Sequence, residues 1–451
     1  MNYTERLNTV IPGGAHTYSR GFDQYPENAP QILKKGKGSY IWDENDRKFL
    51  DYGMALRAVT LGYANDRVNQ AAYREMENGV NLTRPSMIEL EAAELMVDLV
   101  DSAEMVKFAK NGSNVTTAAL KVARAYTGRK YICIPRQHPF FSFDDWFIGK
   151  TPITSGIPEE YHKYTLLFDY NDINSLNKLF DEYHEQIAAV MLEPATTLTP
   201  CQAGCENIQS VDKMCVDCPN NKTNFLHLVK ALCHRNGALF ILDEMITGFR
   251  WHLKGAQYYF DVEPDLSTFG KGMANGFSVA ALTGKKEFMK VGSIDSIGSE
   301  RTFLISTTHG AEMPGLGALV ETVKVYQEEN AINHFWNYGE KLRTGFRNII
   351  RSIGLENNFI IDGNPISMNF LTKDNAGNLS LEYRTLFLQE MINNGVLMPW
   401  IAISLAHNEE SLSTTFIAIE NSLKVYKLAL ENGLDKYLNG RPVKPVFRRY
   451  N

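Results

Sequence analysis

The 451-residue sequence has no apolar run long enough for a transmembrane helix, which needs about 18 or more residues. Its first residues, MNYTERLNTVIPGG, carry charges and turn formers where a secretory signal has an apolar run of about 7–15 residues. With 46 Lys and Arg against 52 Asp and Glu, the net charge of −6 does not suit a nucleic-acid-binding protein. Six cysteines are too few for a disulfide-stabilised scaffold. We therefore expect a soluble, cytoplasmic protein that binds neither membranes nor nucleic acid.

The composition is that of a folded protein with a large core. Hydrophobic residues make up 44% of the chain and charged residues 22%, which is unlike a disordered sequence. At roughly 100–200 residues per domain, the length predicts two or more domains, or one large domain with a smaller one. No repeat, low-complexity tract or long linker is visible. A single small binding module is therefore excluded.

From about residue 86 the sequence alternates between helix-like and strand-like segments. Apolar spacing predicts helices at 89–100, 115–127, 173–185 and 225–235, and strands at 106–109, 131–134, 188–192 and 238–242. This alternation predicts an α/β fold with a mostly parallel sheet between helices. Such sheets bind ligands beyond the carboxyl ends of their strands.

The two ends of the chain have a different pattern. Residues 33–51 predict a short β-meander, and the chain after about residue 313 predicts long helices with a short-strand segment. We expect these ends to form a smaller α+β domain. The expected division is an N-terminal segment 1–60, a large domain 61–312 and a C-terminal segment 313–451.

Residues 110–120, KNGSNVTTAAL, predict a strand that runs directly into a helix. The small residues Gly112 and Ser113 allow the backbone N–H groups of the helix N-terminus to reach an anion, and the Ser113 hydroxyl adds a donor. This is a candidate phosphate site. Ordinary capping of the helix by Ser113 or Asn114 is the alternative.

Two further segments carry chemically active side chains. In ALFILDEMITGFR, an apolar strand ends at Asp243, and a buried carboxylate there needs a cationic partner or a metal unless it caps the next turn. No GxxxxGK[ST] sequence accompanies it, which disfavours a nucleotide-linked metal site. In PDLSTFGKGMANG, Lys271 lies between two glycines on backbone that can fold tightly, as suits a lysine that forms a Schiff base.

An anion site, an acid and an amine are together what a protein must supply to pyridoxal phosphate (PLP). With these segments in view, the sequence resembles the class III aminotransferases of the fold-type I PLP enzymes, nearest to the glutamate-1-semialdehyde 2,1-aminomutase-like members. The resemblance runs nearly end to end. It is carried by IPGGAHTYSRGF (11–22), LDEMITGFR (242–250), PDLSTFGKGMANGFSVAALTG (264–284) and ISLAHNEE (403–410).

The resemblance implies roles for individual residues. Lys271 would bind the cofactor aldehyde covalently and then act as acid and base, and Asp243 would keep the pyridine nitrogen protonated. Met245, next but one along the strand, would point to the same side as Asp243 and pack against the ring. Gly112 and Ser113 would bind the phosphate.

Further residues follow from the same resemblance. Thr307 matches a threonine that reaches the phosphate of the neighbouring subunit, which implies a homodimer. Arg20 matches an arginine that holds the substrate carboxylate. Arg57 is a second cation that the family pattern does not lead us to expect, and it suits another anionic group such as a phosphate on the substrate. The ring-stacking position departs from the family pattern, so that either His138 or Phe140 supplies the stacking face, with His138 favoured. The alternative is that the segment HPFFSFDDWF is a hydrophobic loop that packs on the subunit interface.

The expected activity is transfer of an amino group from an amino acid to a small aldehyde or keto acceptor. The segment GVLMPWIAISLAH is shorter than the aminomutase pattern and lacks its acidic residue, which favours transamination over the aminomutase's 1,2-amino shift. That shift is the first alternative. A non-catalytic scaffold held together by zinc is the second, and the presence of Lys271 and Asp243 argues against it.

Residues 201–218 form an insert where the family has a short loop. Its cysteines, spaced C-x3-C-x9-C-x2-C, are Cys201, Cys205, Cys215 and Cys218. Four thiolates can bind a structural zinc ion in tetrahedral geometry. An iron–sulfur cluster and a metal-free loop, reduced or disulfide-linked, are the alternatives.

Overall fold

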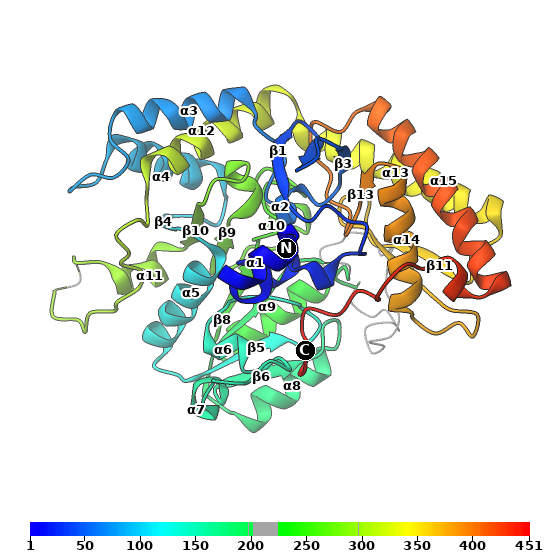
Figure 1. Ribbon diagram of the computed structural model, residues 1–451. Coiled ribbons are helices and arrows are strands. Elements are labelled where there is room, and N and C mark those ends of the chain that lie inside the picture. The colour runs from blue at the N-terminus through cyan, green and yellow to red at the C-terminus, as the bar shows by residue number, and fades with distance from the viewer. Residues whose placement is uncertain (197, 202–223, 296) are drawn as a thin grey trace. The chain divides into compact units, whose positions relative to one another are not determined.

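The computed structural model describes residues 1–451 except 197, 202–223 and 296 (Figure 1). The chain forms two compact units, each described separately below. Unit 1 comprises Met1–Asn65 and Asn333–Arg448, and unit 2 comprises Asp66–Ile332 and Arg449–Asn451. Among the described residues, no helix is long and apolar enough to cross a membrane.

In the described part of unit 2, seven strands form one sheet in the order β4-β10-β9-β8-β7-β5-β6. Only β10 is antiparallel to its neighbours, and the other pairs are parallel. The mostly parallel sheet is therefore confirmed. The strands are β4 (Met105–Ala109), β5 (Tyr131–Pro135), β6 (Thr165–Phe168), β7 (Ile187–Leu192), β8 (Leu239–Asp243), β9 (Leu266–Phe269) and β10 (Ala280–Gly284).

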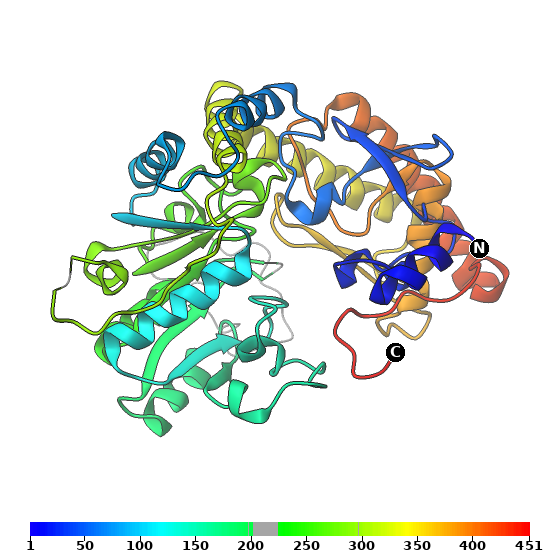
Figure 2. The same cartoon turned by 60° about the vertical axis from the view of Figure 1, so that its left-hand side comes forward.

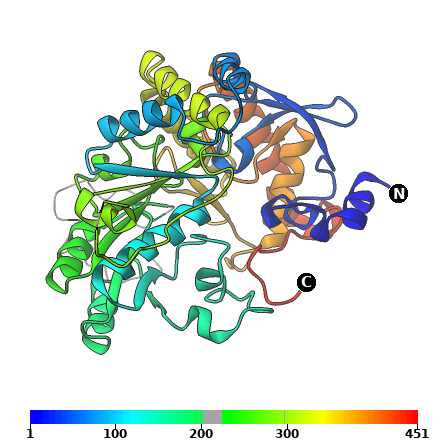
Figure 3. The same ribbon diagram turned by 90° about the vertical axis from the view of Figure 1, so that its left-hand side faces the viewer.

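Helices cover both faces of this sheet, as expected from the sequence. Figures 1 and 3 show α4 and α5 on opposite sides of β4, and Figure 2 shows α5 lying against the strands. The longer helices are α3 (Asp66–Glu77), α4 (Met87–Leu99), α5 (Gly112–Thr127), α8 (Ile173–Glu182), α9 (Phe225–Arg235) and α12 (Met313–Glu328), and the short ones are α6 (Asp145–Ile148), α7 (Glu159–His162), α10 (Ala256–Tyr259) and α11 (Lys286–Met289). Every residue of β7, β8, β9 and β10 is buried, which explains their apolar sequences.

Unit 1 contains the predicted meander. Its strands β1 (Leu33–Lys37), β2 (Tyr40–Asp43) and β3 (Lys48–Asp51) are antiparallel, and β13 (Val396–Leu397) joins β3 in parallel, so that both ends of the chain share one sheet. A hairpin of β11 (Phe359–Asp362) and β12 (Asn369–Thr372) lies apart from it. The helices are α1 (Tyr3–Val10), α2 (Met54–Arg57), α14 (Leu381–Asn393), α15 (Glu409–Asn432) and α13 (Ala331–Ile353), which begins in the last residues of unit 2.

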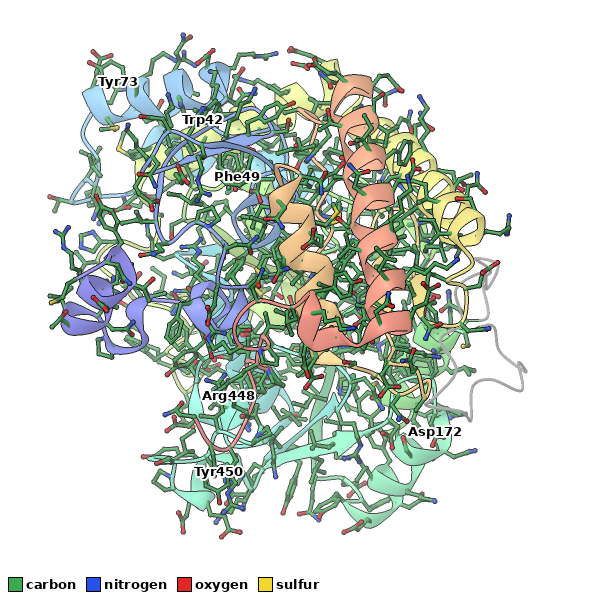
Figure 4. The ribbon with its side chains drawn as sticks, turned by 45° about the vertical axis from the view of Figure 1, so that its right-hand side comes forward. Trp42, Phe49, Tyr73, Asp172, Arg448 and Tyr450 are labelled. Atoms are coloured by element: carbon green, nitrogen blue, oxygen red, sulfur yellow. The ribbon has the colours of Figure 1, made fainter. Side chains whose placement is uncertain are left out.

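Alternation along the meander explains which face of it is buried. Ile41 of β2 and Phe49 of β3 pack with Ile392 in the core of unit 1. Trp42 follows Ile41 in β2 and therefore points to the opposite face of the sheet. It is partly exposed, with the Lys35 ammonium over its ring (Figure 4 labels Trp42 and Phe49).

Candidate active site

The parallel strands of unit 2 end at one edge of the sheet, and the residues that follow them carry the candidate chemistry. Beyond this edge lie Gly112 after β4, His138 after β5, Glu193 after β7, Asp243 at the end of β8 and Lys271 after β9. The fold thus gathers side chains from distant parts of the sequence, as expected for a ligand site in an open α/β sheet.

Asp243 is buried and firmly oriented. Its Oδ1 accepts hydrogen bonds from the Thr268 hydroxyl at 2.9 Å and from the Met245 N–H at 3.0 Å. Burial raises the pKa of Asp243 to about 6, although these hydrogen bonds and the charge of Lys271 act in the opposite direction. A buried carboxyl of this kind becomes fully ionised beside a strong cationic partner such as a pyridinium nitrogen.

Lys271 follows β9, the strand next to the one that ends at Asp243, and its charge lowers the pKa of that carboxyl. The pairing of β8 with β9 brings them together, because Asp243 is opposite Thr268 in the parallel register. The backbone of Lys271 has φ of 44°, a left-handed conformation that is unfavourable for a residue with a side chain. The Tyr326 hydroxyl donates to the Gly272 carbonyl at 3.0 Å and fixes the same turn. Strain of this kind is often found at functional positions.

Met245 connects the lysine turn with the start of α5. A methyl group added to Gly112 would lie 3.1 Å from the Met245 sulfur, and one added to Gly270 would overlap that sulfur. A side chain at either position would therefore push against Met245, more strongly at Gly270 than at Gly112. The strand ends at Asp243, and Met245 lies in the turn that follows. This turn, rather than strand alternation, brings the Met245 N–H to the Asp243 carboxylate.

The start of α5 is fixed by a capping residue and by a hydrogen bond from the segment that follows β5. Asn111 is the capping residue, and its side chain accepts a hydrogen bond from the Asn114 N–H at 3.1 Å. Capping by Ser113 or Asn114 is therefore wrong, because both lie within the first turn of the helix. The Ser113 hydroxyl is buried and accepts from the Phe143 N–H at 3.0 Å. This bond fastens the aromatic segment that follows β5 to the helix N-terminus.

His138 is fully enclosed at the start of that aromatic segment. Its ring packs against Phe141 and Tyr170 at centroid distances of 5.6 and 5.0 Å. Nδ1 accepts the Glu193 N–H at 3.1 Å, and burial lowers the pKa of His138 to about 3, so that the imidazole is neutral. Nε2 is buried without a hydrogen-bond partner among the described residues. Phe140, the alternative stacking residue, is 46% exposed.

Sequence reasoning missed three residues of this site. Glu193 follows β7 as Asp243 ends β8, and an acidic residue directly after a buried apolar run was the signal that could have found it. Thr268 orients Asp243, and Tyr170 packs against His138 while donating to the Pro194 carbonyl at 2.7 Å. Only strand pairing reveals these last two, since neither is near its partner in sequence.

Thr307 lies in an exposed segment of unit 2. Its carbonyl accepts the Gly310 N–H at 3.3 Å, and the Asn81 side chain donates to the neighbouring Thr308 carbonyl at 2.6 Å. The adjacent Glu312 forms an ion pair with Lys110. These contacts tie the Thr307 turn to the segment that leads into α5, with the Thr307 side chain left at the surface.

Arg20 and Arg57 belong to unit 1. Arg20 lines a cavity of about 840 Å³ within that unit, together with Tyr25, Tyr63 and Trp400. Arg57 ends the short segment α2, whose residues Ala55 and Leu56 line the same cavity.

The predicted metal site cannot be located. Cys205, Cys215 and Cys218 lie outside the described residues, and Cys201 is buried, with its N–H donating to the Asn171 side chain at 2.9 Å. Within the described ranges, no group of three or more His, Cys, Asp or Glu residues is arranged to hold a metal ion.

Comparisons with known proteins agree with this geometry. The family model described as Aminotransferase class-III matches residues 23–400. A glutamate-1-semialdehyde 2,1-aminomutase of Alkaliphilus oremlandii is 32% identical over 437 residues, which cover 93% of this chain and 96% of the relative. A 3-aminobutyryl-CoA aminotransferase of Cloacimonas acidaminovorans is 29% identical, with coverage of 95% and 98%.

Solved structures give the same result. The FumI protein of Sphingopyxis sp. MTA144, described as the PLP internal aldimine form, matches with a TM-score of 0.82 at 25% identity over 98% of each chain. A transaminase with PLP bound matches with a TM-score of 0.81 at 20% identity, over 96% of this chain and 97% of the other. The match of sequence and fold over nearly the whole length identifies an enzyme that transfers amino groups with PLP, and the chain belongs to the class III aminotransferase family.

Proposed function

We propose that this enzyme transfers an amino group between two separate molecules, from an amino acid to an aldehyde or keto acceptor. The main support is the placement of Lys271 beside the buried Asp243 at the ligand edge of the sheet. Transamination is favoured over an internal amino shift because the segment 395–407 is short and has no acidic residue, and it lines the cavity of unit 1 with Leu397, Pro399 and Trp400.

The residues around Asp243 fit PLP. Asp243 would hold the ring nitrogen, Met245 would lie against the ring, and Gly112 and Ser113 would receive the phosphate at the N-terminus of α5. The buried carboxyl supports this assignment, because its raised pKa leaves it in need of a cation. When bound, PLP supplies an aldehyde that condenses with amines and a protonated ring that withdraws electrons.

Each protein group then has a defined task. Thr268 and the Met245 N–H both donate to Oδ1 of Asp243. The other carboxylate oxygen, Oδ2, would keep the proton on the ring nitrogen. Nζ of Lys271 would bind the cofactor and afterwards take the proton from the substrate carbon. We assign the stacking face to His138, whose neutral ring is already enclosed by aromatic neighbours.

We assign the substrate's anionic groups to the two arginines of unit 1. Arg20 would bind a carboxylate, since it lines the cavity with the Tyr25 and Tyr63 rings. Arg57 would bind a second anionic group on the acceptor.

We further propose a homodimer, in which Thr307 of each subunit contacts the phosphate held by the other. Exposed apolar side chains in and between helices α3 and α4 of unit 2 support it, because several such side chains from neighbouring segments of the chain are typical of an interface. They include Tyr73 (labelled in Figure 4), Met76, Val80, Leu82, Met87 and Leu90. Sedimentation velocity should give twice the chain mass, and replacing Met87 with Glu should shift the protein to monomer.

The decisive experiment supplies isotope-labelled amino donors with a panel of acceptors and follows the label by mass spectrometry. Transamination predicts a keto acid from the donor and a labelled amine from the acceptor. Conversion of a single amino compound without a second substrate would instead establish the aminomutase activity. Failure of borohydride to fix PLP on Lys271 would contradict both.

A further inference from the structure

The turn that follows the edge strand β6 comprises residues 169–172 of unit 2, between β6 and α8. Asp172, at its end, caps α8 and is labelled in Figure 4. Asn171 has φ of 66°, in the left-handed region that asparagine adopts more readily than most other residues with a side chain. Tyr170 and Asn171 are only 2% and 6% exposed. The turn is therefore built from buried polar side chains, although connections of this kind commonly lie at the surface.

Asp169 and Tyr170 bind this turn to the chain that follows β5. The Asp169 carboxylate accepts from the Arg136 guanidinium at 2.7 Å and from the Gln137 amide at 2.9 Å. The Gln137 side-chain oxygen in turn accepts the Tyr170 N–H at 2.9 Å. Gln137, which directly precedes His138, therefore fixes the turn through both ends of its amide group.

The Tyr170 side chain links the chain after β6 to the chain after β7, and β5 lies between these two strands in the sheet. Its ring packs against the His138 ring at a centroid distance of 5.0 Å, and its hydroxyl donates to the Pro194 carbonyl at 2.7 Å. His138 binds the preceding residue, because its Nδ1 accepts the Glu193 N–H at 3.1 Å. Tyr170 and His138 thus hold the backbone after β7 at two consecutive residues.

Asn171 fastens the chain after β7 at a second place. Its side chain donates to the Thr199 carbonyl at 3.0 Å and accepts the Cys201 N–H at 2.9 Å. These bonds use both ends of the amide group, so that an ionised aspartate, which only accepts, could not replace it. One turn therefore fixes the chain after β7 at Pro194 and again at 199–201.

His138 depends on these contacts for its orientation. Because Nδ1 accepts the Glu193 N–H, the proton of the neutral ring is on Nε2, and the ring cannot turn over without losing this bond. Of the two rings that pack against His138, that of Tyr170 is held at both the N–H and the hydroxyl of its residue. Since buried side chains are closely packed, a displacement of Tyr170 would displace the His138 ring as well.

We propose that Tyr170 is a positioning residue for the cofactor, which acts by fixing the His138 ring that stacks on PLP. The inference rests on the proposed function, which gives His138 this role, and goes beyond it by naming the group that controls the position of His138. Asp169, Gln137 and Asn171 hold the turn from which Tyr170 projects. Tyr170 acts through His138 and needs no contact with PLP or with the substrate.

Tyr170→Phe tests this role, with Tyr426→Phe as the matched control. Tyr426 is also buried, and its hydroxyl donates to the Lys373 carbonyl at 2.7 Å, but it belongs to α15 of unit 1. Loss of the Tyr170 hydroxyl should raise the Kd of PLP roughly fivefold and change the visible circular dichroism of bound PLP. The control should keep the Kd and the spectrum of the wild type. A purely structural role would lower Tm in both variants and leave both PLP measurements unchanged.

His138→Leu shows whether Tyr170 acts through His138. If it does, adding Tyr170→Phe to His138→Leu should change the Kd of PLP by less than about twofold, because the effects of two residues that share one contact are not additive. Gln137→Ala is a second test of the turn in case Tyr170→Phe does not fold. It removes the acceptor of the Tyr170 N–H and should weaken PLP binding as well.

These variants separate the inference from the proposed function. If His138→Leu binds PLP as the wild type does, the stacking role of His138 is wrong and the inference fails with it. If His138→Leu weakens PLP binding but Tyr170→Phe and Gln137→Ala do not, only the inference is overturned. It is also overturned if Tyr170→Phe raises the Kd equally with and without His138. All of these measurements are of binding, so that a transaminase and an aminomutase would give the same result.

Discussion

Replacing Asp243 with Asn should stabilise the cofactor-free protein and weaken PLP binding. Burial raises the pKa of this carboxyl from 3.8 to about 6, which means that the folded protein holds the proton more tightly than the unfolded chain. The free energy of unfolding therefore falls as the pH rises from about 4 to about 6 and stays lowered above that. At 1.36 kcal/mol per pKa unit, the ionised carboxylate costs the cofactor-free protein about 3 kcal/mol.

The asparagine side chain of the Asp243→Asn variant would carry no charge and would still accept the Thr268 and Met245 hydrogen bonds at Oδ1. The cofactor-free variant should gain up to about 3 kcal/mol in urea unfolding at about pH 7 and almost nothing at about pH 4. PLP binding should weaken about 10- to 150-fold, because a charge-assisted hydrogen bond contributes about 1.5–3 kcal/mol. Titration of the cofactor-free protein with PLP, followed by absorbance, measures this loss.

Glu244→Gln is the matched control. Glu244 is also buried, but both of its oxygens accept backbone N–H groups, from Ala256 and Gln257. An amide cannot accept at both positions, so this variant should lose stability and keep its PLP affinity. The assignment of Asp243 would be refuted if Asp243→Asn lowered stability and retained full PLP affinity.

Three other predictions test the site and the insert. Lys271→Ala should lose turnover and borohydride labelling while keeping a folded structure, as measured by peptide mass spectrometry and circular dichroism. Gly270→Ala should lose about 1–3 kcal/mol of stability in urea unfolding, because its methyl group overlaps the Met245 sulfur. If the four cysteines of residues 201–218 bind zinc, elemental analysis should find one zinc ion per chain, lost together with several degrees of Tm on chelation; metal-free protein of unchanged Tm would contradict a zinc site there.

The sheet and the Asp243–Lys271 pair were predictable because buried parallel strands read as apolar runs with polar residues at their ends. Helix α9 was expected at 225–235 and is found there. Strands β9 and β10 were missed, since Ser267, Thr268 and Thr283 make them look like loops. All three side chains are buried in the structure. The Thr268 hydroxyl donates a hydrogen bond to Asp243, so that a polar residue here does not indicate exposure to solvent.

Other features depend on geometry that a one-dimensional pattern does not contain. Met245 was expected next to Asp243 by strand alternation, and it reaches that place by a turn whose N–H binds the carboxylate. Asn111 caps α5 because the helix begins two residues earlier than capping by Ser113 would give. The burial of His138 could not be predicted from the sequence, because it depends on packing against Tyr170, which follows the neighbouring strand β6.

Left-handed backbone conformations occur both at Lys271 and in the turn Met54–Arg57. A left-handed conformation costs a residue with a side chain about 1–2 kcal/mol, so that Met54–Arg57 cost about 4–8 kcal/mol against a net stability of about 5–15 kcal/mol for a typical domain. Glycine would remove most of this cost at each position. Lys271 has the same left-handed conformation, and its proposed role in binding PLP requires an amine that glycine lacks. In the turn Met54–Arg57, the hydrogen bonds that Asp51 and Tyr63 accept from the Gly53 and Ala55 N–H groups offset part of this cost.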